Sequence, residues 1–129
     1  MRIGIPAETC AGETRVAATP ETVKKLLATG HKVSVQTSAG AGASIPDSEY
    51  QTAGATLVGA SDIYAQSEIV LKVRAPSAEE LANLNKGTVL VGLLLPHNAE
   101  LVAAYARQGI AAFSPPLRHL TKRNYGCYY

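Results

Sequence analysis

Residues 88–95 read TVLVGLLL, an apolar run in which no polar residue alternates with the apolar ones. A short run of this kind is typical of a strand that is buried on both faces, as in parallel sheets covered by helices on each side. We therefore expect an α/β fold: a doubly wound, mostly parallel sheet of the flavodoxin-like type, with helices on both faces.

Other short apolar runs, rich in Val and Ile, lie on either side of this one along the chain. Segments of helical period alternate with them, which is the order of elements in doubly wound sheets. The six strands that we expect cover residues 2–5, 32–36, 56–58, 68–73, 88–95 and 110–113.

The segment TPETVKKLLATG, residues 19–30, has the clearest helical pattern. Thr19 is expected as the N-cap, Pro20 as the first helical residue and Gly30 as the C-cap. Its apolar face consists of Val23, Leu26 and Leu27.

Two further helices are expected near the other end of the chain. Ser77 and Glu80 have the spacing of a capping box, ahead of Leu81 and Leu84. Residues 99–108 repeat apolar side chains at helical spacing and are followed by Gly109.

Composition limits the classes of function. A chain of 129 residues with 47% hydrophobic and 17% charged residues can form one globular domain. A formal charge of +2, with 5% aromatic residues and no Trp, gives no reason to expect a nucleic-acid partner. Cys10 and Cys127 have neither zinc-ligand nor disulfide-framework spacing, so no metal site is expected and a reducing cytosol fits.

Residues 4–30, GIPAETCAGETRVAATPETVKKLLATG, contain G-I-P-x-E, then E-x-R-V-A-x-T-P, then V-x-x-L and a closing Gly. This pattern resembles the shared N-terminal signature of alanine dehydrogenases and pyridine nucleotide transhydrogenase alpha subunits. HKVSVQTSAGAGASIPDSEYQTAGATLV and EIVLKVRAP extend the resemblance to about Phe113. We expect residues 1–113 to form the family's N-terminal lobe, and residues 114–129 to be an atypical tail.

The first part of the signature places Glu8, Glu13 and Arg15 in a loop after the first strand. The carboxyl edge of such a sheet is where ligand crevices form. A solvated network of loop side chains is the alternative interpretation. Gly40-Ala41-Gly42 also follows a strand, but without a third Gly at the dinucleotide-binding spacing we interpret it as a flexible loop.

In the dehydrogenases, the resemblance implies that an Arg, a Lys and a His of this lobe hold the keto acid. Arg15 and Lys72 occupy the first two positions, and an Arg fork suits a carboxylate. The alternatives are a loop ion pair for Arg15 and a Lys72 that extends along the sheet edge to solvent. Transhydrogenases share both residues, so these two positions do not separate the enzymes.

The position that separates the two enzymes is Leu95, which aligns with the dehydrogenases' His; transhydrogenases resemble this chain in having an apolar residue followed by Pro. His97 is expected to start the next helix rather than to transfer protons. The sequence therefore favours a transhydrogenase lobe without catalytic residues.

That resemblance implies hydride transfer from NADH to NADP, coupled to proton movement by beta or membrane subunits. The intact protein would be a homodimer in the cytoplasm, peripheral to the inner membrane through its partners. NAD(H) is the implied cofactor, but the lobe that binds it follows later in the family. Because these residues do not include that lobe, we expect the isolated chain to be inactive. No run of about 18 apolar residues occurs, so we expect no direct membrane span.

The tail SPPLRHLTKRNYGCYY differs from the family, which continues with a loop resembling P-R-I-S-R-A-Q-S-M-D-V. Codons for residues 119–128, read one base later, can encode I-S-R-S-A-T-M-D-V. We hypothesise a frameshift near residue 114, which sequencing of the coding DNA would test. A natural short terminus is the alternative. Two other interpretations of the whole chain stay open: a truncated alanine dehydrogenase and a non-catalytic interaction module.

Overall fold

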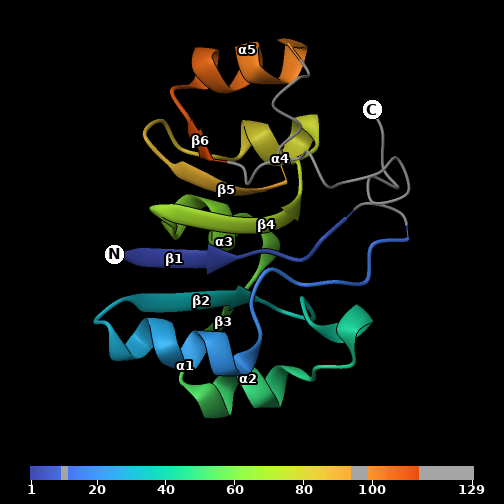
Figure 1. The fold of residues 1–129 in the computed structure, drawn as a ribbon, viewed down its shortest axis with the longest axis vertical. Helices are drawn as coiled ribbons and strands as arrows, with labels where there is room; N and C mark the ends of the chain where they lie inside the picture. The colour runs from blue at the N-terminus through green and yellow to red at the C-terminus, as the bar shows by residue number, and fades with distance from the viewer. Residues whose placement is uncertain (10–11, 94–98, 114–129) are drawn as a thin grey trace.

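The computed structural model describes residues 1–9, 12–93 and 99–113, and these form a six-stranded sheet (Figure 1). All its strand pairings are parallel. The strands are β1 (Arg2–Ile5), β2 (Lys32–Gln36), β3 (Thr56–Val58), β4 (Ile69–Arg74), β5 (Val89–Leu93) and β6 (Ala111–Phe113). The expected parallel α/β sheet is confirmed.

The strand order is β3-β2-β1-β4-β5-β6. Without the three-residue edge strand β3, the remaining order is that of a flavodoxin-like sheet; with β3, the order is that of a Rossmann fold. Because the strands are parallel, β1 and β4, which are neighbours, end at the same edge of the sheet. The loop after β1 leaves from this edge, on the right in Figure 1.

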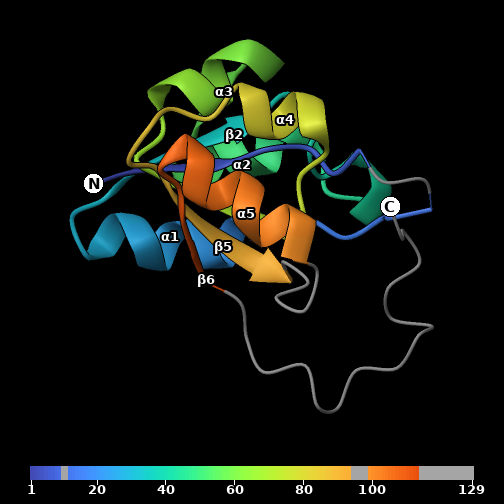
Figure 2. The same cartoon turned by 90° about the horizontal axis from the view of Figure 1, so that it is seen from above.

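Helices cover both faces of the sheet. Helices α1 (Pro20–Ala28) and α2 (Asp47–Ala53) pack against β2 and β3, whereas α3 (Ala60–Gln66) packs against β1 and β2 from the other side (Figure 2). Helices α4 (Ala78–Ala82) and α5 (Ala99–Gln108) contribute Leu81 and Tyr105 to the same core as Ile63 of α3. The second core, between β1, β2, α1 and α2, contains Val23 and Tyr50.

The close approach of α3 to β1 explains Gly4 of the signature. A Cβ at this position would collide with the Ser67 side chain and lie 3.1 Å from the carbonyl oxygen of Ile63. Only glycine lets the helix end sit this near the strand, because any larger residue would have to move packed backbone.

The expected helices within residues 19–30, after Ser77 and over residues 99–108 are confirmed, with Thr19 as N-cap and Pro20 at the first position of α1. The expected C-cap was wrong by one residue: Thr29 is the C-cap, and Gly30, with φ 94°, follows it. This is the position where a left-handed residue ends a helix, so glycine is favoured there.

Helices α2 and α3 carry weak sequence signals, and no bounds were expected for them. Each has seven residues, and their N-caps, Pro46 and Gly59, make no side-chain capping hydrogen bond. Each also buries few apolar residues, so neither the capping pattern nor the helical period stands out.

Four strand ends differ from expectation by one residue. The fourth strand begins and ends one residue later than expected, the fifth begins one residue later, at Val89, and the sixth begins one residue later, at Ala111. The tail at 114–129, with its proposed frameshift, lies outside the described residues, so the division at residue 113 stays a prediction. No helix in the described ranges is long and apolar enough to span a bilayer.

Candidate functional site

Glu8, in the loop after β1, binds the end of β4. The pairing of β4 with β5 shifts register between Leu71 and Arg74. At this irregularity the two oxygens of Glu8 accept the backbone N–H groups of Val73 and Arg74, each at 3.0 Å. The carboxylate therefore takes the place of a ladder partner where the strand is distorted.

Lys72 is buried between two carboxylates, and only 1% of its side chain is exposed. Its Nζ lies 3.5 Å from Glu8 Oε1 and donates a hydrogen bond of 3.0 Å to Glu80 Oε2. The interpretation of Lys72 as a lysine that extends to solvent is wrong, because these two carboxylates compensate its charge inside the protein.

Glu80 is the most heavily hydrogen-bonded member of this group. Its Oε2 accepts from the Tyr64 hydroxyl at 2.6 Å as well as from Lys72. Its Oε1 accepts from the Thr9 hydroxyl at 2.9 Å and from the backbone N–H of Ser77 at 3.0 Å. The Ser77 hydroxyl in turn accepts from the Glu80 N–H, so the expected capping box is confirmed.

Glu13 binds two arginines. Arg15 donates from Nε and Nη2 to the two Glu13 oxygens at 2.9 Å, and Arg74 donates from Nε at 2.8 Å. The Arg15 side chain is 53% exposed, whereas that of Glu13 is 4% exposed. Arg15 thus forms the loop ion pair that was one alternative, but the network is not solvated at Glu13 or at Glu8, whose side chain is 2% exposed.

The hydrogen bonds from Arg15 to Glu13 lower the pKa of that carboxyl from 4.5 to about 2, against an opposing effect of burial. Burial raises the pKa of Glu80, but the charge of Lys72 and the hydrogen bonds from Ser77 and Tyr64 outweigh it and give a value of about 2. Burial, with the neighbouring Glu80, raises the pKa of Tyr64. At neutral pH both carboxyls are ionised and Tyr64 is the hydrogen-bond donor.

The two expected pocket residues do lie at one edge of the sheet, but in different surroundings. Lys72 is enclosed, and Arg15 faces solvent. Sequence reasoning missed the roles of Tyr64 and Arg74 and assigned Glu80 only to a helix cap. The signal for Arg74 was its place in LKVRAP, two residues after Lys72, which puts both on the same face of the strand.

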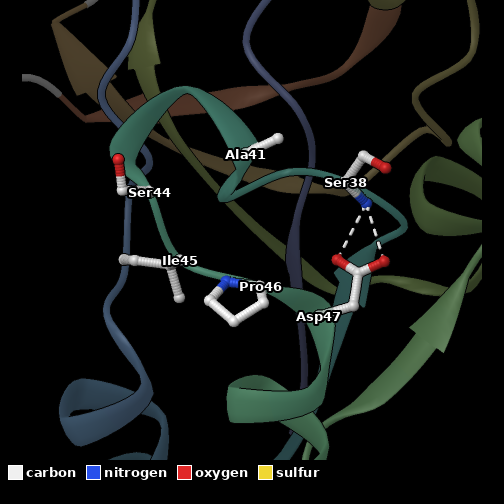
Figure 3. Close-up of a pocket in the computed structure, with 6 residues that line it drawn as sticks. All are labelled: Ser38, Ala41, Ser44, Ile45, Pro46 and Asp47. Atoms are coloured by element: carbon white, nitrogen blue, oxygen red, sulfur yellow. Dashed lines mark hydrogen bonds between the residues drawn. The ribbon is translucent and has the colours of Figure 1, made fainter.

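A second feature lies at the end of β2, around the Gly40-Ala41-Gly42 segment (Figure 3). This segment forms a short 3₁₀ helix, η1 (Ala41–Ala43), rather than an irregular loop. A Cβ on Gly40 would lie 2.7 Å from the Ile45 carbonyl oxygen, and one on Gly42 would lie 3.1 Å from the Thr14 backbone. Close packing against the protein itself therefore accounts for these glycines.

A shallow pocket adjoins this segment in Figure 3, where both oxygens of Asp47 accept the backbone N–H of Ser38, at 2.9 and 3.2 Å. Ser38 and Ser44 have φ values of 65° and 61°. The pocket contains neither Arg15 nor Lys72; it is lined by Ser38, Ala41, Ser44, Ile45, Pro46 and Asp47.

The remaining expected positions, Leu95, His97 and the two cysteines, lie outside the described residues. Among the described side chains, no three His, Cys, Asp or Glu gather in a way that could hold a metal ion.

Comparison with known proteins identifies relatives of both enzymes. The alanine dehydrogenase of Mycobacterium tuberculosis is 44% identical over 95 residues, which are 73% of this chain and 26% of that protein. An NAD(P) transhydrogenase alpha-subunit protein of Rhodospirillum rubrum is 39% identical over 126 residues, covering 91% of this chain and 32% of that protein. The chain thus spans about a third or less of these relatives.

The solved structure of a transhydrogenase from Sinorhizobium meliloti has the same fold, with a TM-score of 0.87 and 37% identity over 95% of this chain and 37% of that one. The family model described as "Alanine dehydrogenase/PNT, N-terminal domain" matches residues 4–117. The chain therefore belongs to the family of alanine dehydrogenase and pyridine nucleotide transhydrogenase N-terminal domains.

Proposed function

We propose that this chain is the N-terminal lobe of the NAD(H)-binding alpha subunit of an NAD(P) transhydrogenase, and that it takes no part in proton chemistry. The observation that carries the proposal is Leu95, an apolar residue followed by Pro96 where the dehydrogenases have a His. The described part of the ionic network at the ends of β1 and β4 also contains no His: its ionisable groups are Glu8, Glu13, Arg15, Tyr64, Lys72, Arg74 and Glu80.

The pairing of the pocket residues supports a structural role for them. Arg15 and Lys72 match the substrate-binding positions of the dehydrogenases, but here each already binds a carboxylate of the chain itself. A keto acid would have to displace Glu13 or Glu80 from them. The lobe then serves the hydride transfer by supporting the cofactor-binding part of the subunit, not by contacting the reacting atoms.

The described residues do not fit a dinucleotide, although the strand order is that of a Rossmann fold. The Gly-x-Gly segment at 40–42 follows β2, and its glycines pack against Ile45 and Thr14 and leave no open cradle for a pyrophosphate. The turn after β1, where the dinucleotide fingerprint lies in a Rossmann fold, contains a single glycine, Gly12. NAD(H) would be held by the part of the subunit that the relatives have beyond the matched region. We expect these 129 residues alone to be inactive in hydride transfer.

In the intact enzyme the subunit would form a homodimer on the cytoplasmic side of the inner membrane. It would associate there with the beta or membrane subunits that move protons. These partners are part of the proposal because the named transhydrogenase relatives are alpha subunits.

A chimera tests the proposal. The chain is fused in place of the matching lobe of a transhydrogenase alpha subunit, and hydride transfer from NADH to an NADP analogue is measured with the partner subunits present. We expect transfer, and no alanine-dependent reduction of NAD. Alanine deamination by the chimera would overturn the proposal. A Leu95→His chimera is the matched variant that restores the dehydrogenase residue.

A truncated alanine dehydrogenase is the second candidate, because the Mycobacterium tuberculosis enzyme is 44% identical to the chain. Calorimetry with pyruvate distinguishes this candidate from a transhydrogenase lobe. If pyruvate binds the wild-type chain and the Arg15→Ala variant loses this binding, the result would favour the dehydrogenase. We expect no heat of binding with either protein.

A non-catalytic interaction module is the third candidate. Val102 is 43% exposed and Phe113 is 60% exposed, which leaves large apolar side chains on α5 and β6 in contact with solvent. Mass determination by light scattering tests whether copies of the chain associate.

A further inference from the structure

The edge of the sheet where the strands begin, on the left in Figure 1, lies opposite the candidate site. Arg2 and Lys32 are the first residues of β1 and β2, and they are direct neighbours in the parallel register. Lys86 precedes β5, and a Cβ on Gly109, ahead of β6, would lie 2.7 Å from the Lys86 Cγ. All three cations are exposed, so this edge carries positive charge in contact with solvent.

Backbone hydrogen bonds hold these segments side by side. The N–H of Lys32 donates to the Met1 carbonyl at 3.0 Å. The N–H of Glu68 donates to the Arg2 carbonyl, and that of Val89 to the Glu68 carbonyl, both at 2.9 Å. Neighbouring strands lie about 4.8 Å apart, so the row of segments from β2 to β6 is about 20 Å long. The cationic row of this edge consists of Arg2, Lys32, Lys86 and, in the last turn of α5, Arg107.

Acidic residues do not balance the cationic row. Glu68 lies within it and pairs with Arg2 at 3.6 Å. Among the described residues, Lys32, Lys86 and Arg107 form no ion pair. Like charges on directly neighbouring residues of two strands are destabilising, as for Arg2 and Lys32. The dipole of α5 favours a cation in its last turn, but Arg2, Lys32 and Lys86 lie outside the helices, so helix stability does not explain them.

Acidic side chains gather at the other edge of the sheet. Helices α1 to α5 each begin after the carboxyl end of a strand and have an acidic residue in the first turn: Glu21, Asp47, Asp62, Glu79 and Glu100. The formal charge of the chain is only +2, but its charges are separated between two edges. An anionic surface orients such a molecule, because it attracts the cationic row and repels the starts of the helices.

We propose that the cationic row is a docking surface for an anionic lipid bilayer. Each Lys or Arg near such a surface strengthens binding by about fivefold. Met1, which is 59% exposed, lies beside Arg2 and Lys32 and adds an apolar side chain that can enter the headgroup region. An acidic protein partner would need an apolar centre in the interface, and among the described residues of this edge Met1 is the one large exposed apolar side chain.

The proposal rests on the proposed function, which puts the intact subunit beside a membrane, and it adds a direct contact with lipid. Docking through the cationic row turns the ends of β1 and β4, with Glu8 and Lys72, away from the bilayer. The candidate site would then face the part of the subunit that holds the cofactor.

Binding of the full chain to lipid vesicles tests the proposal. The chain is sedimented with phosphatidylcholine vesicles that contain about 30 mol% phosphatidylglycerol, in about 0.1 M salt, where the Debye length is about 10 Å. We expect binding to these vesicles and none to phosphatidylcholine alone. Lys32→Gln/Lys86→Gln should lower the partition coefficient about 25-fold, about fivefold for each cation removed.

Matched variants separate the cationic row from net charge. Arg15→Gln/Lys24→Gln removes the same charge from the other edge and from the middle of α1, so the partition coefficient should change less than about twofold. Glu68→Gln removes the acid of the row and should raise the coefficient about fivefold, a gain that unfolding would not produce. Glu79→Gln makes the same change of charge at the start of α4 and should leave the coefficient nearly unchanged.

Equal losses in the two double variants, or equal binding to vesicles with and without phosphatidylglycerol, would overturn the proposal. Binding to soluble polyglutamate but not to vesicles would overturn it in favour of an acidic protein partner. These outcomes concern the edge of the sheet alone, whereas alanine deamination by the chimera would overturn the proposed function even if the chain binds vesicles as expected.

Discussion

Glu8 and Lys72 lie 3.5 Å apart where the first and fourth strands of the sheet end side by side. The pair is buried, and Glu8 also accepts two backbone N–H groups of β4 beside the register shift. One carboxylate of the GIPAE segment therefore balances a buried charge and completes the hydrogen bonding of a distorted strand.

Replacement of Glu8 by glutamine is expected to lower the free energy of unfolding by about 2–4 kcal/mol, because it removes a buried counter-ion and one of two amide acceptors. Urea denaturation measures this change. Glu68→Gln is the matched control: Glu68 pairs with Arg2 at 3.6 Å, both side chains are largely solvated, and the expected loss is below about 1 kcal/mol. Equal losses in the two variants would contradict the role given to Glu8.

The low pKa of Glu80 predicts a specific dependence of stability on pH. Because its pKa in the folded protein is about 2 and its ordinary value is 4.5, its contribution is complete above about pH 4.5 and is lost as pH falls toward 2. As pH falls from about 4.5 to about 2, we expect the free energy of unfolding of the wild type to decrease by on the order of 3 kcal/mol more than that of Glu80→Gln.

Glu79→Gln is the control for the pH series, since Glu79 is exposed in the same helical turn. We expect its stability to follow the wild-type curve from about pH 5 to about pH 2, apart from a constant offset of a few tenths of a kcal/mol. If Glu80→Gln follows the wild-type curve as well, other carboxyls account for the acid sensitivity.

Two buried tyrosines provide a comparison of hydrogen bonds to charged and neutral acceptors. The Tyr64 hydroxyl donates to the Glu80 carboxylate at 2.6 Å, and the Tyr50 hydroxyl donates to the Ala18 carbonyl at 2.7 Å. Tyr64→Phe should cost about 2–3 kcal/mol and Tyr50→Phe about 1 kcal/mol, measured by denaturant unfolding. A larger loss in Tyr50→Phe would show that the Glu80 site contributes less than the geometry indicates.

The strands could be expected from sequence because their signal is local. Val89–Leu93 is apolar along its whole length, and a strand with that pattern must be covered on both faces. The order of the strands was harder to predict from the sequence. It is the Rossmann order only because β3, a strand of three residues, lies at the edge beside β2; without β3 the order would be flavodoxin-like. Neither period nor capping reports which strand lies at an edge.

Sequence predicted the residues of the candidate site only at positions that the family resemblance marks. Glu8, Arg15 and Lys72 stand at positions that a resemblance can mark, but the partners of Lys72 depend on tertiary packing. Tyr64 lies on a helix with no clear sequence signal, and Glu80 satisfied a local rule as a capping residue. Its second role, as a counter-ion of Lys72, depends on how near the start of α4 lies to β4, where Lys72 Nζ donates to Glu80 Oε2.

Glu13 and Arg15 are expected to contribute unequally to stability, although they bind each other. Arg15 is 53% exposed, so Arg15→Gln loses an ion pair that solvent already screens, at a cost below about 1 kcal/mol. Glu13→Gln removes the ionised acceptor of Arg74, whose side chain is 10% exposed, and should cost about 2–3 kcal/mol. Urea unfolding of both variants at neutral pH measures the difference. The pKa of Glu13 is lowered to about 2, so the excess free energy of unfolding of the wild type over Glu13→Gln should shrink as pH falls below about 4.5. If this excess stays constant down to about pH 2, the charge of Glu13 is not what stabilises the loop.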